Sequence, residues 1–65
     1  MAGEREVLFE FVQIGSTVKV TAVDVASGVE VSIVGHPSAG DAALKRLALQ
    51  KLTYVLARRD RRQDT

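Results

Sequence analysis

The chain has 65 residues, a formal net charge of +1 and no cysteine. This length allows one domain, so we expect residues 1–65 to form a single unit near the lower size limit for independent folding. Without cysteine there are no disulfides or cysteine-based zinc sites, and one histidine excludes a histidine-rich metal site, so no metal or cofactor is expected. Of the usual supports for a small fold, oligomerisation remains.

The hydropathy and charge patterns indicate a cytosolic protein that does not enter a membrane. No segment reaches the roughly 18 consecutive apolar residues of a membrane span. The first residues contain Glu4 and Glu6, whereas a signal peptide needs a basic start followed by an apolar core. Residues 1–44 carry two basic and six acidic side chains, a net −4, and residues 45–65 carry seven basic and two acidic ones, a net +5. The first part is therefore acidic and the last part basic.

Three apolar segments predict β-strands, near residues 6–14, 17–25 and 29–34. Gly15 and Ser16 separate the first two, and a glycine at the first central position favours a two-residue type II′ hairpin. That turn pairs Ile14 with Thr17. The same register then sets Phe11 opposite Val20 and places a large side chain beside a smaller one.

The second turn leads to the same core face as the first. Gly28 suits a positive φ at the end of a four-residue turn, and this turn pairs Asp24 with Val29. The register then sets Val31 beside Ala22. The predicted core face contains Val7, Phe9, Phe11, Val18, Val20, Ala22, Val29, Val31 and Ile33.

A C-terminal α-helix is predicted near residues 39–59, because apolar residues recur there at steps of three and four. Pro37 precedes it and disfavours helical angles at His36. Gly40 weakens the first turn, so a start at Asp41 is the alternative. The expected fold class is α+β, in which a three-stranded antiparallel meander packs against this helix. Residues 1–5 and 61–65 are polar ends that we expect to be disordered.

The predicted elements carry more apolar residues than one sheet–helix contact needs. The helix has two apolar lines, and its apolar arc is about twice the usual stripe of about 100°. The second face of the sheet is also partly apolar. A deeply seated helix and an ordinary solvated sheet face would explain this surplus. We favour a homodimer, in which either the second helix line or the second sheet face becomes buried. The predicted self-association residues are Leu49, Leu52 and Leu56 on the helix, or Leu8, Val12 and Val23 on the sheet.

A basic cluster near the C-terminus offers a second kind of function, because its side chains suit phosphate contacts. Its members are Lys45, Arg46, Lys51, Arg58, Arg59, Arg61 and Arg62. The simpler interpretation is a solvated helix face whose last arginines balance the helix dipole. Tyr54 is the sole aromatic residue in the helix, so a platform for base stacking is not indicated.

Catalysis is not expected, and no catalytic residue is predicted. His36 and Ser38 are close in sequence, but a catalytic pair would also need an orienting group. The loop from Gly35 to Gly40 lies between a strand and a helix, as phosphate loops do. It lacks both the Gly-Lys-Ser/Thr ending and the GxGxxG pattern.

Two family resemblances can be stated from these segments. The order of three strands and a helix, with residues 29–34 leading into an Ala/Leu/Lys-rich helix, resembles the last part of a double-stranded-RNA-binding domain. The first helix of that domain is missing, and Ala39-Gly40-Asp41 stands where that family has a basic run. No functional residue is therefore carried over from it.

The chain also resembles a family of small alphaproteobacterial proteins classed as a domain of unknown function. The similar segments are residues 7–11, 18–24, 30–35 and 44–52. This resemblance implies a bacterial cytosolic protein and no particular activity. The function we expect is a self-associating structural or interaction module without catalysis, and the alternative is a nucleic-acid-binding module that uses the basic helix.

Overall fold

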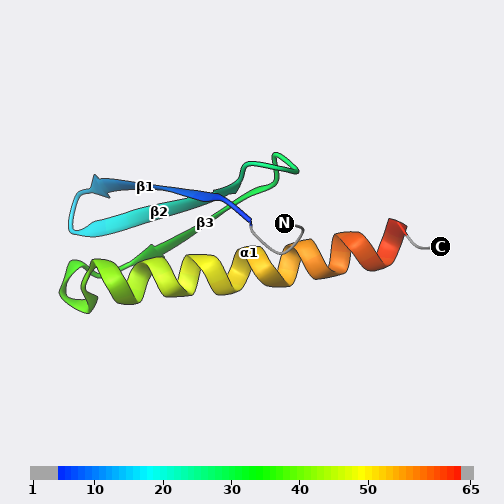
Figure 1. Cartoon of the computed structure of the whole chain (residues 1–65). Helices are drawn as coiled ribbons and strands as arrows, with labels where there is room; N and C mark the ends of the chain where they lie inside the picture. Colours follow the sequence, from blue (N-terminus) through cyan, green and yellow to red (C-terminus); the bar gives the residue numbers. More distant parts are fainter. Residues whose placement is uncertain (1–4, 64–65) are drawn as a thin grey trace.

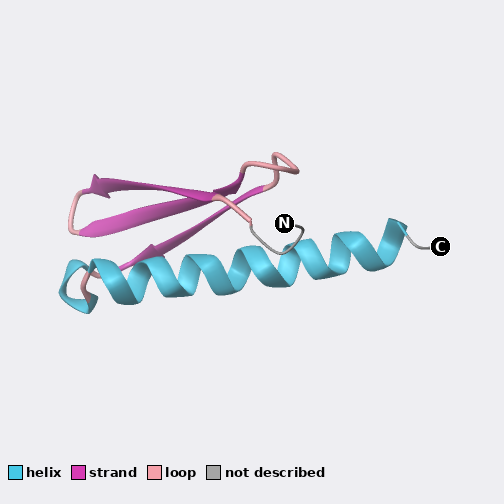
Figure 2. Cartoon of the chain, in the orientation of Figure 1, coloured by secondary structure: helices cyan, strands magenta, loops and turns pink. Residues whose placement is uncertain are grey.

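The computed structural model describes the backbone of residues 5–63 and the side chains as far as Arg59. It consists of an antiparallel sheet in the order β1-β2-β3, with one helix across one of its faces (Figures 1 and 2). The elements are β1 (Val7–Ile14), β2 (Thr17–Asp24), β3 (Glu30–Gly35), a short 3-10 turn η1 (Pro37–Ala39) and α1 (Asp41–Gln63). The predicted α+β fold is confirmed.

The strands begin and end within one residue of their predicted limits, whereas the helix takes the alternative start and extends beyond its predicted end. Gly40 has φ 89°, and its N–H donates to the Pro37 carbonyl, so it closes η1 instead of joining the helix. The helix therefore begins at Asp41 and continues to Gln63, beyond the predicted end at residue 59. Of the ends expected to be disordered, residues 1–4 and 64–65 lie outside the described residues. Arg5 is described, with its side chain 3.1 Å from Asp24, and the backbone of residues 61–63 continues α1.

Both predicted strand registers are confirmed. Ile14 pairs with Thr17 and Phe11 with Val20, and Gly15 at φ 60° supplies the positive angle that a type II′ turn requires. On the other side, Val31 pairs with Ala22. The N–H of Asp24 donates to the Val29 carbonyl at 2.8 Å, which closes the second turn. The turn residues and the alternation of side chains thus specify one register.

The core lies between the helix and the strands below it. Its buried apolar residues are Val20, Ala22, Val31, Leu44, Ala48, Leu52 and Leu56. Val7, Phe9, Val18, Val29 and Ile33 are partly buried against them. The predicted core face is thus correct except at Phe11, which remains 38% exposed.

The helix is not centred on the sheet. It packs mainly on β2 and β3, and β1 is the strand farthest from it (Figure 1). The side chains beneath the helix include Val20 and Ala22, whereas both phenylalanines of the chain lie on β1. Small residues on the central strand let the helix approach closely there. Because the helix is displaced toward β2 and β3, Phe11 is left exposed and the sheet is open on the side of β1.

Candidate functional site

The leucine line predicted to mediate self-association is divided by the fold. Leu52 and Leu56 are 1% and 5% exposed, so the sheet of the same chain already covers them. Leu44, Ala48, Leu52 and Leu56 form one row at four-residue spacing along the helix, and that row is what packs on the sheet. Leu49 is 41% exposed. Of the predicted helix residues, Leu49 alone is therefore available to a partner.

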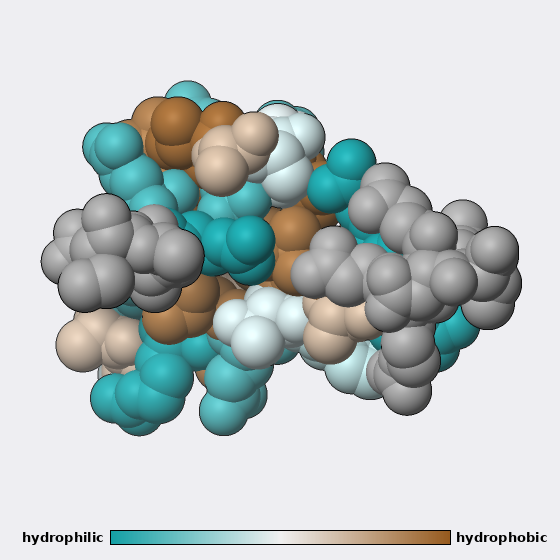
Figure 3. Space-filling model, turned by 45° about the vertical axis from the view of Figure 1, so that its right-hand side comes forward, coloured by the Kyte–Doolittle hydropathy of each residue, from teal (hydrophilic) through white to brown (hydrophobic). Residues whose placement is uncertain are grey.

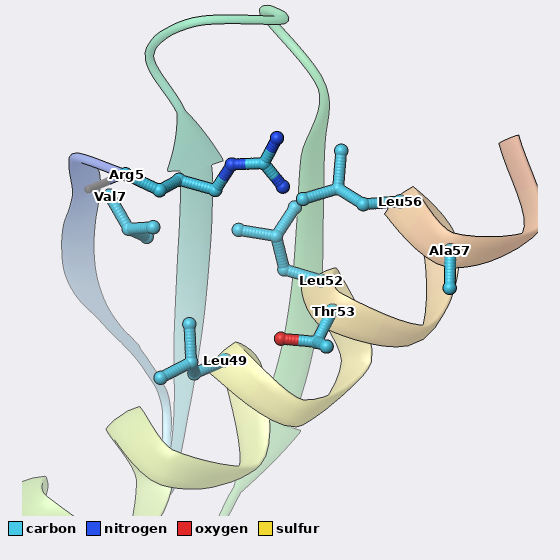
Figure 4. Close-up of a pocket in the computed structure, with 7 residues that line it drawn as sticks. All are labelled: Arg5, Val7, Leu49, Leu52, Thr53, Leu56 and Ala57. Atoms are coloured by element: carbon cyan, nitrogen blue, oxygen red, sulfur yellow. The ribbon is translucent and has the colours of Figure 1, made fainter. Parts of the chain in front are cut away.

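Leu49 lies on the side of the helix that faces β1. There it borders a shallow open hollow of about 230 Å³ between α1 and the start of β1 (Figure 4). The residues around this hollow are Arg5, Val7, Leu49, Leu52, Thr53, Leu56 and Ala57. Its wall is mostly apolar, with the Arg5 side chain at its rim. The exposed Phe11 lies on the same face of β1 as Val7.

The outer face of the sheet, which points away from the helix, is polar in the middle and partly apolar at its two ends, where Glu30 and Lys19 also lie. Leu8 and Val23 are paired at one end, and Val12 and Ile14 lie at the other. Between them Glu10, Thr21 and Ser32 form a row across the three strands. The hydroxyl oxygens of Thr21 and Ser32 are 2.9 Å apart and hydrogen-bonded. A flat partner covering this whole face would therefore bury a carboxylate and two hydroxyls.

The predicted sheet residues differ in exposure. Leu8 and Val12 are exposed, and Val23 on the central strand is half-buried between its neighbours. Ile14 and Val34 are also exposed on this face, and Val34 is the most open of the described large apolar side chains at 66%. On the surface shown in Figure 3, brown apolar patches alternate with teal hydrophilic groups. The apolar surface is thus divided into several patches.

The two edge strands of the sheet differ in how they are covered. On β3, the ammonium group of Lys51 from the helix donates to the Ser32 carbonyl at 2.9 Å. On β1, the even-numbered residues bond to β2, as the bond from the Val25 N–H to the Glu6 carbonyl shows for this register. The N–H and C=O groups of Val7, Phe9, Phe11 and Gln13 therefore point away from the sheet. In the described part of the chain, no backbone or side-chain bond to these groups is present.

The basic residues do not form one stripe. The Lys45 ammonium lies 5.0 Å from the centre of the Phe9 ring on β1, whereas Lys51 reaches β3 on the opposite flank of the helix. Arg58 donates to the Tyr54 hydroxyl at 2.9 Å. Arg46 and Arg59 are also exposed, and the side chains of Arg61 and Arg62 lie outside the described residues. The predicted phosphate-contact residues are thus spread over both flanks of the helix.

The pair formed by His36 and Ser38 has a local structural role. The imidazole Nδ1 of His36 accepts a hydrogen bond from the Ser38 backbone N–H at 3.1 Å and lies 2.8 Å from the Ser38 hydroxyl. These contacts cap the short turn η1, and both side chains are exposed. The geometry is that of a side chain closing its own loop.

One buried acid, Asp24, is not among the candidate site residues that the sequence analysis identifies. Asp24 is completely buried at the end of β2. Its Oδ2 accepts bonds from the Ser27 hydroxyl at 2.6 Å and the Ser27 N–H at 3.0 Å, and its Oδ1 is 3.1 Å from Nε of Arg5. The Ser27 bonds, aided by the charges of Arg5 and Arg59, lower the pKa of this carboxyl despite its burial.

Two signals in the sequence point to this role of Asp24. Strand alternation places Asp24 on the core face with Val20 and Ala22, and a serine follows three residues later in the turn. An aspartate whose side chain bonds the turn that follows it stabilises that turn. Asp24 therefore anchors the β2–β3 turn, and Arg5 ties the start of β1 to the same point.

Two further features limit the chemistry of the described residues. No group of three or more His, Cys, Asp or Glu side chains among them is placed to hold a metal ion. Within the same residues, α1 is not apolar enough over a sufficient length to cross a membrane.

The fold defines a class of small α+β domain, in which a three-stranded antiparallel meander is covered on one face by a single C-terminal helix. The family model described as "Domain of unknown function (DUF6898)" matches residues 4–59, so the chain belongs to that family. This confirms the resemblance to an uncharacterised domain family. No curated protein and no solved structure matches the chain.

Proposed function

We propose that this protein is a self-associating structural or interaction module that acts as a homodimer and carries no catalytic centre of its own. One observation supports this most strongly: the single helix packs mainly on β2 and β3, so β1 is only partly covered on its helix side and is open on its outer face and along its edge. Four of the nine exposed large apolar side chains of the described residues lie on β1, namely Leu8, Phe11, Val12 and Ile14.

The energetics favour a partner for this surface. Burying an exposed leucine, isoleucine or phenylalanine side chain completely contributes roughly 1.5–3 kcal/mol. A core in a chain of this size supplies only about 3–5 kcal/mol of net stability. The free energy gained by burying several half-exposed apolar side chains on one strand is therefore substantial compared with the net stability of the whole chain. A symmetric dimer is the commonest arrangement that covers such a surface, because the same patch meets its own copy.

The local contacts support this module over the alternative functions. The His36 imidazole is engaged in capping its own loop, which does not favour a hydrolytic pair. Lys45 and Lys51 contact opposite edges of the sheet, which does not favour a phosphate track along one helix face. The open hollow beside Leu49 is smaller than the usual few hundred Å³ or more of a small-molecule site, and a larger one of about 440 Å³ is an open depression lined, among the described residues, by residues 54–59 of the helix alone.

Sedimentation equilibrium or light scattering tests the proposal on the unmodified chain. We expect a species of twice the 7.0 kDa chain mass at tens of micromolar, which dissociates on dilution. A duplex DNA or RNA titrated at low salt serves as the comparison, and we expect no salt-dependent binding. A monomer at every concentration contradicts the proposal, and duplex binding that weakens steeply with salt favours the nucleic-acid alternative.

A further inference from the structure

We propose that the partner at this surface is a second copy of the chain, which pairs antiparallel through the β1 edge and extends the sheet to six strands. This inference rests on the proposed self-association and specifies its surface. It places the contact along the β1 edge, where Leu49 of the predicted helix line and Leu8 and Val12 of the predicted sheet face lie at the margins.

The first support is the β1 edge itself. β1 runs for eight residues, pairs with β2 without a bulge and contains no proline or lysine. Its one charged residue is Glu10. Natural proteins protect exposed edges with lysines, prolines, bulges or covering elements, and an edge without them is a template for another strand. Val7, Phe9, Phe11 and Gln13 present alternating N–H and C=O groups to such a strand.

The β3 edge is less accessible to an incoming strand. β3 has six residues, and the helix packs directly on it. The Lys51 ammonium donates a hydrogen bond to the outward-pointing carbonyl of Ser32 in the middle of the strand. An incoming strand would have to displace this charged donor. The β3 edge is therefore partly covered by the described residues and the β1 edge is not, so an added strand is expected to pair with β1.

The second support is the placement of the large side chains. Phe11 lies on the helix side of β1 beyond the area that the helix covers, Phe9 is partly buried next to it, and Leu49 lies on the flank of the helix toward β1. In a continuous six-stranded sheet the two helices lie on one face, with a gap above the junction of the two β1 strands. The phenylalanines of both copies would fill that gap. Aromatic residues are enriched in the centre of protein interfaces.

The size of the contact sets the expected strength. An aromatic side chain buries about 150–250 Å² when enclosed, and the exposed side chains of β1 are each about half covered already. Lateral contact between two strands and two helix flanks therefore reaches only the low end of specific interfaces, near 1,000 Å² in total. We expect a reversible dimer that dissociates in the micromolar range.

Self-complementarity points to a second copy as the occupant. β1 is apolar on both faces, so a two-fold axis through Phe11 sets Phe11 beside its copy, Leu8 beside Ile14 and Glu10 beside Val12. No like charges meet in this register. A two-fold axis at Glu10 would oppose two carboxylates, which is unfavourable. The outer sheet face offers no comparable match, because the row of Glu10, Thr21 and Ser32 crosses it.

Amide hydrogen exchange on the unmodified chain tests this geometry. In a single chain the amides of Phe9, Phe11 and Gln13 have no partner and exchange fast, whereas those of the even-numbered neighbours are protected. We expect both sets to be protected in the dimer and the odd set to lose protection on dilution. The Ser32 amide at the β3 edge stays unprotected and serves as the internal control.

Two matched variants locate the surface independently. Both replaced side chains are exposed, so both variants keep the core intact. Phe11→Lys places two ammonium groups beside each other at the axis, and we expect the dissociation constant to rise at least about tenfold. Val34→Lys alters the outer face of the sheet, and we expect it to leave the dissociation constant unchanged. A dimer that keeps the alternating exchange pattern, or that is lost in Val34→Lys and kept in Phe11→Lys, overturns the β1 pairing while leaving self-association intact. A wild-type chain that stays monomeric overturns both.

Discussion

Leu49 and Leu52 are three residues apart on one helix, and the fold gives them opposite roles. Leu52 is 1% exposed and packs in the core, whereas Leu49 is 41% exposed beside the open β1 flank. We predict that Leu52→Ala strongly destabilises the single chain. We predict that Leu49→Ala leaves the fold of the single chain nearly unchanged and weakens the dimer.

The magnitudes follow from burial. Truncation of a fully buried leucine costs about 2–5 kcal/mol, because both the transfer free energy and a cavity contribute. A chain of this size has a net stability of only about 3–5 kcal/mol, so Leu52→Ala leaves a marginal or largely unfolded population. Surface substitutions away from special features change stability by about 0.5 kcal/mol or less, and Leu49, which keeps some packing, is expected to cost about 1 kcal/mol.

Urea titration followed by far-UV circular dichroism, at a protein concentration low enough to keep the chain monomeric, measures both variants against the wild type. We expect the urea concentration at the unfolding midpoint to fall strongly for Leu52→Ala and slightly for Leu49→Ala. Equal losses would show that both leucines pack in the single chain. A larger loss for Leu49→Ala would refute the assignment of the helix faces.

Three further predictions test other parts of the structure. A methyl group added at Gly35 would overlap the Leu44 side chain, so Gly35→Ala should lower the unfolding free energy by about 1–3 kcal/mol in the same titration, and no loss would contradict this packing. Because the pKa of Asp24 is lowered by folding, its contribution to stability is complete above the unfolded value of about 3.9 and is lost as the pH falls through the folded value. Asp24→Asn should therefore be less stable than the wild type at neutral pH and show a smaller decline below about pH 4, and parallel pH profiles would count against this role. Lys51→Ala removes the hydrogen bond that covers the Ser32 carbonyl, so the β3 edge should gain affinity for other strands. Light scattering should then detect larger assemblies, and unchanged assembly would mean that this contact does not protect the edge.

The strand register could be predicted because two independent constraints specify it. Gly15 and Gly28 mark the turns, and the alternation of apolar residues places Val20 and Ala22 on the same face from either side. A shift of one residue would move these side chains to the other face, so the pattern tolerates only one register. The existence and type of the elements follow from the same local rules.

The roles of the helix leucines could not be predicted in the same way. Spacing alone placed Leu52 and Leu56 on a line with Leu49, because an apolar arc does not reveal which part of it meets the sheet. That choice depends on the lateral position of the helix, and Ala48 and Ala22 belong to the buried cluster over which it lies. Tertiary packing of this kind leaves no periodic signal along the chain.

The candidate surface was also only partly visible in the sequence. Leu8 and Val12 were predicted to lie in a contact, and both are exposed on β1. The free hydrogen-bonding edge beneath them depends on strand order and on the position of the helix. The buried role of Asp24 follows from alternation and turn chemistry together, which identify an acid on the core face only when both are applied.

Backbone amide exchange along β1, measured on the wild-type chain at a series of concentrations spanning the micromolar range, is the clearest test of pairing through the β1 edge. We predict that the amides of Phe9, Phe11 and Gln13 become as protected as their neighbours when the mass doubles from 7.0 kDa, and that they lose this protection together on dilution. Fast exchange at these three amides at every concentration, with the even-numbered amides protected, would contradict it.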